Sequence, residues 1–354
     1  MPTESASLSL LSIISLLSFF VTLLTSKFSN KISKGILMDQ DFEKPQAFHK
    51  EAISRSGGLS GIVSLIVFFI LFNYLFDVFV FDYFILSIAM FSLGFLEDLK
   101  FKINPSYRLM LMILILTAFI FFESIQISSI DLKFLNIWMN NKVFSAIFIL
   151  LCFLFIVNGA NLIDGFNGLL TIHLLIINSI LFFINLNNGN ENLTVIITSQ
   201  IVILLVFLLF NFPRAKMFLG DSGSYLFGSL TALNIIYTNN LNQQVSSFFF
   251  CVILFYLFFE VFFSFFRKLY SRKSPFKPDS QHLHMLLYRF LAKSGKFHDC
   301  NYLNSILINL IYICMVLPGL FFTDNGLICK YWFFSLLVIY IIFYSLLYSF
   351  EKKQ

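Results

Sequence analysis

Long apolar runs that are nearly free of charge limit most strongly how this chain can fold. A hydrocarbon core about 30 Å thick needs roughly 20 helical residues to cross it. Runs close to that length recur from one end of the sequence to the other. With 58% hydrophobic and 12% charged residues, 354 residues could not hide so much apolar surface in one soluble core. The pattern predicts an all-α polytopic integral membrane protein, with residues 1–354 forming a single membrane-embedded domain.

The apolar runs predict about eleven transmembrane helices. The first run lacks the basic start and the small-residue cleavage site of a signal peptide, so we interpret it as a retained span. Two runs, 83–96 and 224–237, are short for a full crossing. In chain order the predicted spans are 8–24, 60–80, 83–96, 107–122, 143–158, 168–186, 194–212, 224–237, 246–266, 303–322 and 331–349.

The distribution of basic residues predicts the orientation. If the N-terminus is outside and the spans alternate, only Lys133, Lys142 and Lys330 of the 24 basic residues fall in outside loops. The C-terminus is then inside. We therefore expect a multi-pass membrane protein whose working surface faces the cytoplasm. The net charge of +5 follows from this topology and gives no argument for nucleic acid as a partner.

One polar stretch, residues 158–168, lies between two apolar runs and reads Asn-Gly-Ala-Asn-Leu-Ile-Asp-Gly-Phe-Asn-Gly. Polar groups at the edge of an apolar span are costly, which favours a functional use. Their three-residue spacing keeps consecutive members on neighbouring parts of one helix face. A membrane helix closed by an Asn/Gly turn is the alternative, and this stretch alone leaves it open. The polar members are Asn158, Asn161, Asp164 and Asn167.

Other unusual polar residues gather in loops that are predicted to face the same compartment. Carboxylates at the inner ends of different spans suit a hard divalent cation, which prefers oxygen ligands. Basic side chains and a Gly-rich segment at 220–223 suit phosphate groups. Together they indicate phosphoryl transfer with magnesium. Taken singly, each carboxylate is also explained as a solvated residue at the end of a span, and each basic residue by the preference of such residues for inside loops. The carboxylates are Glu97, Asp98, Asp164 and Asp221, and the basic residues include Lys50, Arg55, Lys216 and Arg272.

Four motifs occur in order between about residues 50 and 290. They are Gly94-Phe-Leu-Glu97-Asp98, Asn161-Leu-Ile-Asp164-Gly-Phe-Asn-Gly-Leu, Phe218-Leu-Gly-Asp221-Ser-Gly-Ser and Pro278-Asp-Ser-Gln-His282-Leu-His284. Together they resemble the polyprenyl-phosphate N-acetylhexosamine-1-phosphate transferases. The resemblance implies a protein of a bacterial inner or plasma membrane, with ten or eleven helices around a cytoplasm-facing cleft. It also implies that a lipid phosphate attacks the sugar-bearing phosphate of a UDP-sugar and releases UMP, with Mg²⁺, or alternatively Mn²⁺, as cofactor.

The resemblance assigns roles to single residues. The expected catalytic residues are Glu97, Asp98, Asp221, His282 and His284, with Asp221, and as a second candidate Asp98, as the metal ligand. The expected substrate-binding residues are Lys50, Asn158, Asn161, Asp164, Asn167, Lys216 and Arg272. The expected partners are a UDP-sugar, a polyprenyl phosphate lipid and the membrane, and a homodimer stays open.

Three positions depart from the family pattern. Glu97 stands where Asp is usual and keeps the charge on a longer arm. Asn167 stands where Asp is common and cannot act as a base. Met285 replaces the third histidine, and the sequence His-Leu-His-Met looks closer to the branch that begins O-antigen-like polysaccharides. We therefore expect the first membrane step of cell-surface polysaccharide synthesis. The peptidoglycan-precursor branch, phospho-MurNAc-pentapeptide transferase, is the alternative.

The competing hypothesis from another class is a lipid-linked glycan transporter or flippase. Such a protein places ionisable residues in the middle of its spans, and the only mid-span acid in this sequence is Glu260. A CDP-lipid transferase is a second rival, but its paired-Asp motif is absent. Release of UMP from a UDP-sugar would separate the transferase from both alternatives.

Overall fold

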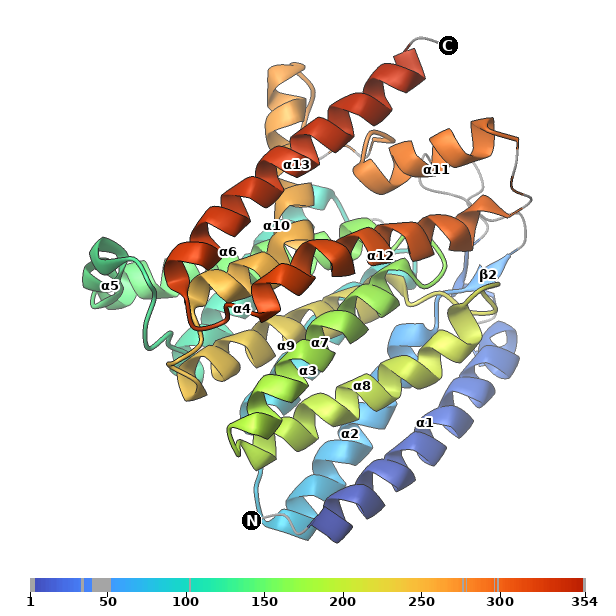
Figure 1. Cartoon of the computed structure of the whole chain (residues 1–354). Helices are drawn as coiled ribbons and strands as arrows, with labels where there is room; N and C mark the ends of the chain where they lie inside the picture. The colour runs from blue at the N-terminus through green and yellow to red at the C-terminus, as the bar shows by residue number, and fades with distance from the viewer. Residues whose placement is uncertain are drawn as a thin grey trace.

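The fold is almost entirely helical (Figure 1). It is given by a computed structural model that describes residues 4–32, 35–39, 52–101, 103–275, 277, 279–295, 297 and 299–352. In chain order the helices are α1 (Glu4–Ile32), α2 (Gly57–Phe76), α3 (Phe81–Asp98), α4 (Pro105–Phe122), α5 (Lys133–Met139), α6 (Lys142–Ile163), α7 (Leu169–Asn187), α8 (Glu191–Asn211), α9 (Gly220–Leu241), α10 (Ser247–Tyr270), α11 (Leu283–Lys293), α12 (Cys300–Leu320) and α13 (Gly326–Lys352). Strands β1 (Met38–Asp39) and β2 (Ile53–Ser54) form a small antiparallel pair.

The long helices of the described chain correspond one by one to the predicted apolar runs. Nine of them are long and apolar enough to cross a membrane. The remaining two, α3 and α9, contain the runs 83–96 and 224–237, which the sequence marked as short. The protein is therefore an all-α, multi-pass membrane protein. The short helices α5 and α11 and the strand pair were not predicted, because each is too short to give a clear periodic signal.

Helix α9 lies at the centre of the bundle and is buried along nearly its whole length. Glycines let its neighbours come close, as small residues commonly do between membrane helices. A Cβ on Gly94 of α3 would collide with the backbone of Asp221, and one on Gly58 of α2 would collide with Ser222 and Gly223. These three helices therefore meet backbone to backbone where α9 begins.

The two ends of the bundle carry different structures (Figure 1). The strand β2, helix α11 and the C-terminal end of α13 lie towards one end, whereas the chain begins at the opposite end. The segment before α9 joins the strand pair, since the Phe218 amide donates to the Ser54 carbonyl at 2.7 Å. The polar loops that the sequence groups together thus meet at the end that carries the sheet.

A layer of buried amides connects α3, α7, α8 and α9. The Asn234 amide donates to the side-chain oxygens of Asn178, at 2.9 Å, and Gln200, at 2.8 Å. The hydroxyl of Tyr83 donates to Asn234 at 2.9 Å. Asn178, Gln200 and Asn234 are at most 1% exposed, so each needs these partners. The middle of the bundle is thus held by neutral polar groups.

We expect Asn234→Ala to lower the stability of the purified protein, because it removes the donor to the side-chain oxygens of Asn178 and Gln200. The expected loss is about 1 kcal/mol or more, read as a lower unfolding temperature in detergent. Asn187→Ala, an exposed change on α7, is the matched control. Equal unfolding temperatures for the two variants would contradict the role given to the amide layer.

Candidate active site

The N-terminus of α9 is capped by a residue of another helix. Its own N-cap residue, Leu219, has no side chain that accepts a hydrogen bond. The Asp98 carboxylate of α3 instead accepts from the amides of Asp221, at 3.0 Å, and Ser222, at 2.9 Å, and from the Ser222 hydroxyl at 2.5 Å. A carboxylate there satisfies free N–H groups and the positive end of the helix dipole. Gly220 has φ +77°, and a Cβ on it would lie 2.7 Å from an oxygen of Asp98.

Arg55, just before α2, lies among three carboxylates. Its guanidinium donates to Asp39 from Nε, at 3.0 Å, and from Nη2, at 2.7 Å. Its Nη1 lies 4.0 Å from Asp98 Oδ1 and 3.9 Å from Asp221 Oδ2. Burial lowers the pKa of Arg55, but the nearby charges of Asp221, Asp39 and Asp98 outweigh burial and raise it. The sequence showed Arg55 only as one of several basic residues, and its central place depends on the fold.

Asn161 joins the polar stretch 158–168 to the start of α9. Its side-chain amide donates to Asp221 Oδ1 at 2.5 Å and to the Ser224 hydroxyl at 3.0 Å. One oxygen of Asp221 is therefore held by an amide, and the other lies near a guanidinium. Asn161 and Asp221 belong to two of the four sequence motifs, so these two motifs meet at the carboxylate of Asp221.

Asp164 lies directly after the end of α6 and next to the same charges. The pKa of Asp164 is raised to about 8, first because the carboxyl is buried and next because it lies near the negative charges of Asp221 and Asp98. The positive charge of Arg55 opposes this rise only in part. The protein alone therefore favours a protonated Asp164 at neutral pH, and a cation at this place would favour the ionised form.

The prediction of one shared helix face for the stretch 158–168 is wrong, because α6 ends at Ile163 and the glycines that follow turn the chain. The Asn158 amide points to α4 and lies 3.6 Å from Met112 Sδ. The Asn167 amide donates to the Pro213 carbonyl at 2.9 Å, which ties two loops together. The fold gives both side chains internal partners, and their expected substrate contacts stay predictions.

The remaining predicted residues lie around this centre or outside the described chain. The Glu97 carboxylate is 3.9 Å from the guanidinium of Arg108. Lys216 and Arg272 are exposed in loops, where a charged ligand can reach them. Lys50 lies outside the described residues. The structure therefore gives positions for three of these four residues, and their roles stay predictions.

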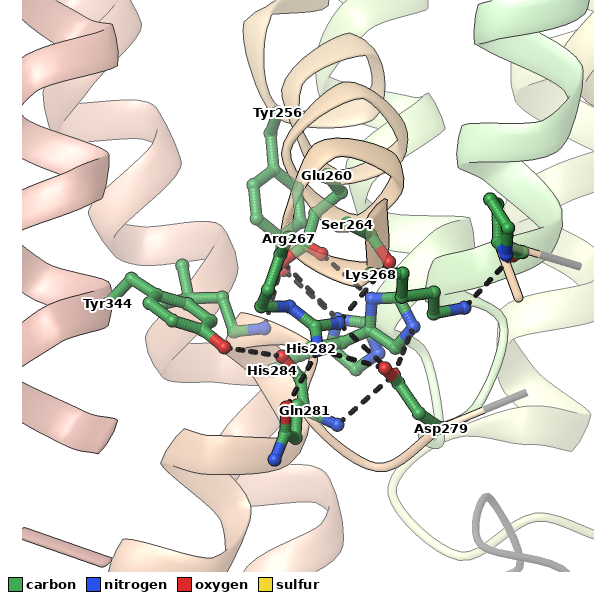
Figure 2. Close-up of polar contacts among 12 residues, drawn as sticks. Tyr256, Glu260, Ser264, Arg267, Lys268, Asp279, Gln281, His282, His284 and Tyr344 are labelled. Atoms are coloured by element: carbon green, nitrogen blue, oxygen red, sulfur yellow. Dashed lines mark hydrogen bonds and ion pairs between the residues drawn. The ribbon is translucent and has the colours of Figure 1, made fainter. Parts of the chain in front are cut away.

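The two predicted histidines form a second cluster around α10 (Figure 2). The ring nitrogens of His282 lie 3.1 Å from Glu260 Oε2 and 3.3 Å from Asp279 Oδ1. The ring of His284 meets that of Phe166 edge to face, with centroids 5.8 Å apart. Because Phe166 belongs to the turn after α6, the histidines lie beside the segment that carries Asp164. The sequence indicates Glu260 only as a mid-span acid.

The donor set fits a magnesium ion shared with a substrate. In the part of the chain that the structure describes, no three His, Cys, Asp or Glu side chains are grouped to hold a metal. Mg²⁺ is commonly held by one or two carboxylates, with phosphate oxygens and waters completing its shell. Asp221, whose side chain is 22% exposed, and the neighbouring Asp164 meet that requirement. Asp98 is already engaged by the start of α9.

Comparison with known proteins gives consistent matches. The model of glycosyl transferase family 4 matches residues 80–239. An undecaprenyl-phosphate alpha-N-acetylglucosaminyl 1-phosphate transferase of Thermotoga maritima is 30% identical over 78% of this chain and 81% of its own length. A protein of that name from Escherichia coli O157:H7 is 25% identical over 77% of this chain and 74% of its own length. A phospho-N-acetylmuramoyl-pentapeptide-transferase of Clostridium perfringens is 32% identical over 40% of this chain and 47% of its own length.

We expect Asp98→Asn to lower the unfolding temperature of the protein even without substrates. An amide nitrogen would then replace one carboxylate oxygen and face the N–H group of either Asp221 or Ser222, at a cost of about 1–3 kcal/mol. Asp77→Asn, an exposed change after α2, should leave the unfolding temperature unchanged. If Asp98→Asn abolished activity at full stability, the capping role would be refuted in favour of a purely chemical one.

Proposed function

The chain belongs to glycosyl transferase family 4, and we propose that it transfers a sugar 1-phosphate from a UDP-sugar to a polyprenyl phosphate. The sugar is proposed to be an N-acetylhexosamine. The two relatives named for N-acetylglucosaminyl 1-phosphate transfer align over more than three quarters of the chain, whereas the pentapeptide-transferase match covers 40% of it. The reaction would be the first membrane step of a cell-surface polysaccharide.

The proposed reaction exchanges one phosphoanhydride bond for another. An oxygen of the lipid phosphate bonds to the sugar-bearing phosphorus, and the bond between the two phosphates of the UDP-sugar breaks. UMP leaves with the bridging oxygen, and the sugar remains on a polyprenyl diphosphate. A phosphate monoester with a second pKa near 6 is already largely ionised at neutral pH, so a general base adds little.

The contact between Asn161 and Asp221 carries this proposal, because it joins two motifs in one site beside Arg55. Asn161 orients the carboxylate of Asp221. Arg55 offers a fixed positive charge to phosphate oxygens. Mg²⁺ held by Asp221 and Asp164 would neutralise charge on the diphosphate. Positioning and charge neutralisation of this kind supply most of the rate enhancement in phosphoryl transfer.

We place the site on the cytoplasmic side of a bacterial inner or plasma membrane. All but three of the 24 basic residues fall on that side if eleven helices span the membrane with the N-terminus outside. Cytoplasmic UDP-sugars could then reach Asp221, and the lipid phosphate could approach from the inner leaflet.

We expect Asp221→Asn to reduce UMP release at least about 10²-fold. The assay uses purified protein with undecaprenyl phosphate, Mg²⁺ and UDP-N-acetylglucosamine, followed by other UDP-N-acetylhexosamines. Asp324→Asn, an exposed change between α12 and α13, is the control and should keep the wild-type rate. Full Mg²⁺-dependent UMP release by Asp221→Asn would contradict the site. The absence of UMP with every sugar, together with transport of a lipid-linked glycan in vesicles, would favour the flippase.

A further inference from the structure

Glu260 is a buried acid that the reaction described above leaves unused. It lies inside α10, ten residues before the helix ends at Tyr270, and is 1% exposed. A carboxylate in such a place is destabilising unless it is paired and hydrogen bonded. It contacts residues 282–284, the segment that opens α11, and the hydroxyls of Tyr256 and Tyr340 also lie beside it. Figure 2 shows Glu260 pointing from α10 towards both histidines.

We propose that Glu260 is a positioning residue that gives His282 and His284 different roles. It holds His282 in a closed network of contacts between α10 and the loop that leads to α11, which we call the clasp. It also orients His284 so that one ring nitrogen stays available to an oxygen of the substrate phosphates. The second half of this proposal rests on the proposed transferase function, whereas the first half concerns the protein alone.

The first role follows from the contacts of His282. Its Nδ1 is 3.1 Å from Glu260 Oε2, and its Nε2 is 3.3 Å from Asp279 Oδ1. Asp279 is in turn paired with Arg267 of α10 at 2.9 Å. Burial raises the pKa of Asp279, but the hydrogen bond from Arg267 and the nearby positive charges together outweigh burial and lower it, so Asp279 keeps its negative charge. Both ring nitrogens of His282 therefore face carboxylate oxygens within the clasp.

The clasp closes the loop between α10 and α11 at several further points. The Leu283 amide donates to Glu260 Oε1 at 3.0 Å. The Lys268 ammonium donates to the Lys277 carbonyl at 2.8 Å, and the Tyr344 hydroxyl of α13 donates to the Gln281 carbonyl at 3.1 Å. Figure 2 shows Lys268, Gln281 and Tyr344 around the two histidines. The start of α11 is therefore fixed relative to α10 and α13.

His284 has a different set of neighbours. Its Nδ1 lies 3.3 Å from the Tyr256 hydroxyl and 3.9 Å from Glu260 Oε1. Its Nε2 is buried and has no hydrogen-bond partner among the described residues. The ring stacks on His282 with centroids 5.6 Å apart, and Phe166 covers its edge. A buried polar atom without a partner usually marks a place where a ligand or water binds.

The protonation of His284 agrees with a donor role. Burial lowers its pKa to about 3, although the charge of Glu260 opposes this. The ring is therefore neutral and carries a single proton. In this proposal the Tyr256 hydroxyl donates to Nδ1, which leaves that proton on Nε2, the nitrogen without a partner. A phosphate oxygen that reached Nε2 would accept this hydrogen bond.

The test uses Glu260→Gln, which keeps the size of the side chain and an oxygen for the Leu283 amide. The kcat/KM for UMP release should fall at least about tenfold, because His284 loses its orientation. Unfolding temperature should change little, and Glu260→Asp should recover part of the rate. Glu191→Gln, an exposed change at the start of α8, is the matched control.

A double-variant comparison separates positioning from a general structural role. If Glu260 acts through His284, then Glu260→Gln should add less than about twofold once His284→Gln is present. An equal loss in both backgrounds, or an unchanged kcat/KM for the single variant, would overturn the proposal.

A spectroscopic measurement tests the contacts of the two histidines without requiring catalytic activity, so it still applies if the proposed function is wrong. The chain has five histidines, so ¹⁵N spectra of labelled rings in detergent can be assigned with His282→Gln and His284→Gln. Glu260→Gln should shift the signals of both rings. Absence of UMP from the wild-type protein would refute the transferase activity while these shifts still supported the clasp. Unchanged ring signals would refute the clasp itself.

Discussion

The carboxylate of Asp98 at the N-terminus of α9 is the interaction on which the rest of the site depends. It lets α9 begin without a capping residue of its own, and it holds the ends of α3 and α9 together. The close approach is possible only because Gly94 and Gly220 lack side chains at this crossing. The same interaction fixes Asp221 in the first turn of α9, where its carboxylate meets groups from α6 and from the loop before α2.

The site built on this cap carries more negative charge than the protein neutralises. Asp98 and Asp221 share one guanidinium, that of Arg55, which also bonds Asp39, and Asp164 lies near the same charges. The raised pKa of Asp164, about 8, is the consequence of burial and of these uncompensated charges. A site of this kind is prepared for a cation and for a substrate that brings phosphate oxygens to it, which is the physical basis of the proposed transfer reaction.

The sequence predicted the long helices and the order of the motifs because both depend on local patterns, a length set by the membrane and short runs of polar residues. It did not predict which partner each polar residue takes, because that depends on contacts between distant segments. Asp98 was expected to act in catalysis, and its capping bonds to α9 appear only in the folded chain. Arg55 was one basic residue among several. Nothing in the apolar run around Asn234 indicated its buried partners. The prediction of one shared helix face for residues 158–168 was wrong because α6 ends at Ile163.

The central claim is that Asn161 and Asp221 act as one unit in the site. The most direct measurement is the affinity for a UDP-N-acetylhexosamine with Mg²⁺, determined by calorimetry for the wild-type protein, Asn161→Ala, Asp221→Ala and the double variant. We predict that each single change weakens binding at least about tenfold and that the double variant binds no worse than the weaker single variant. Additive losses from the two changes would contradict the claim, because they would show that the two side chains contribute independently.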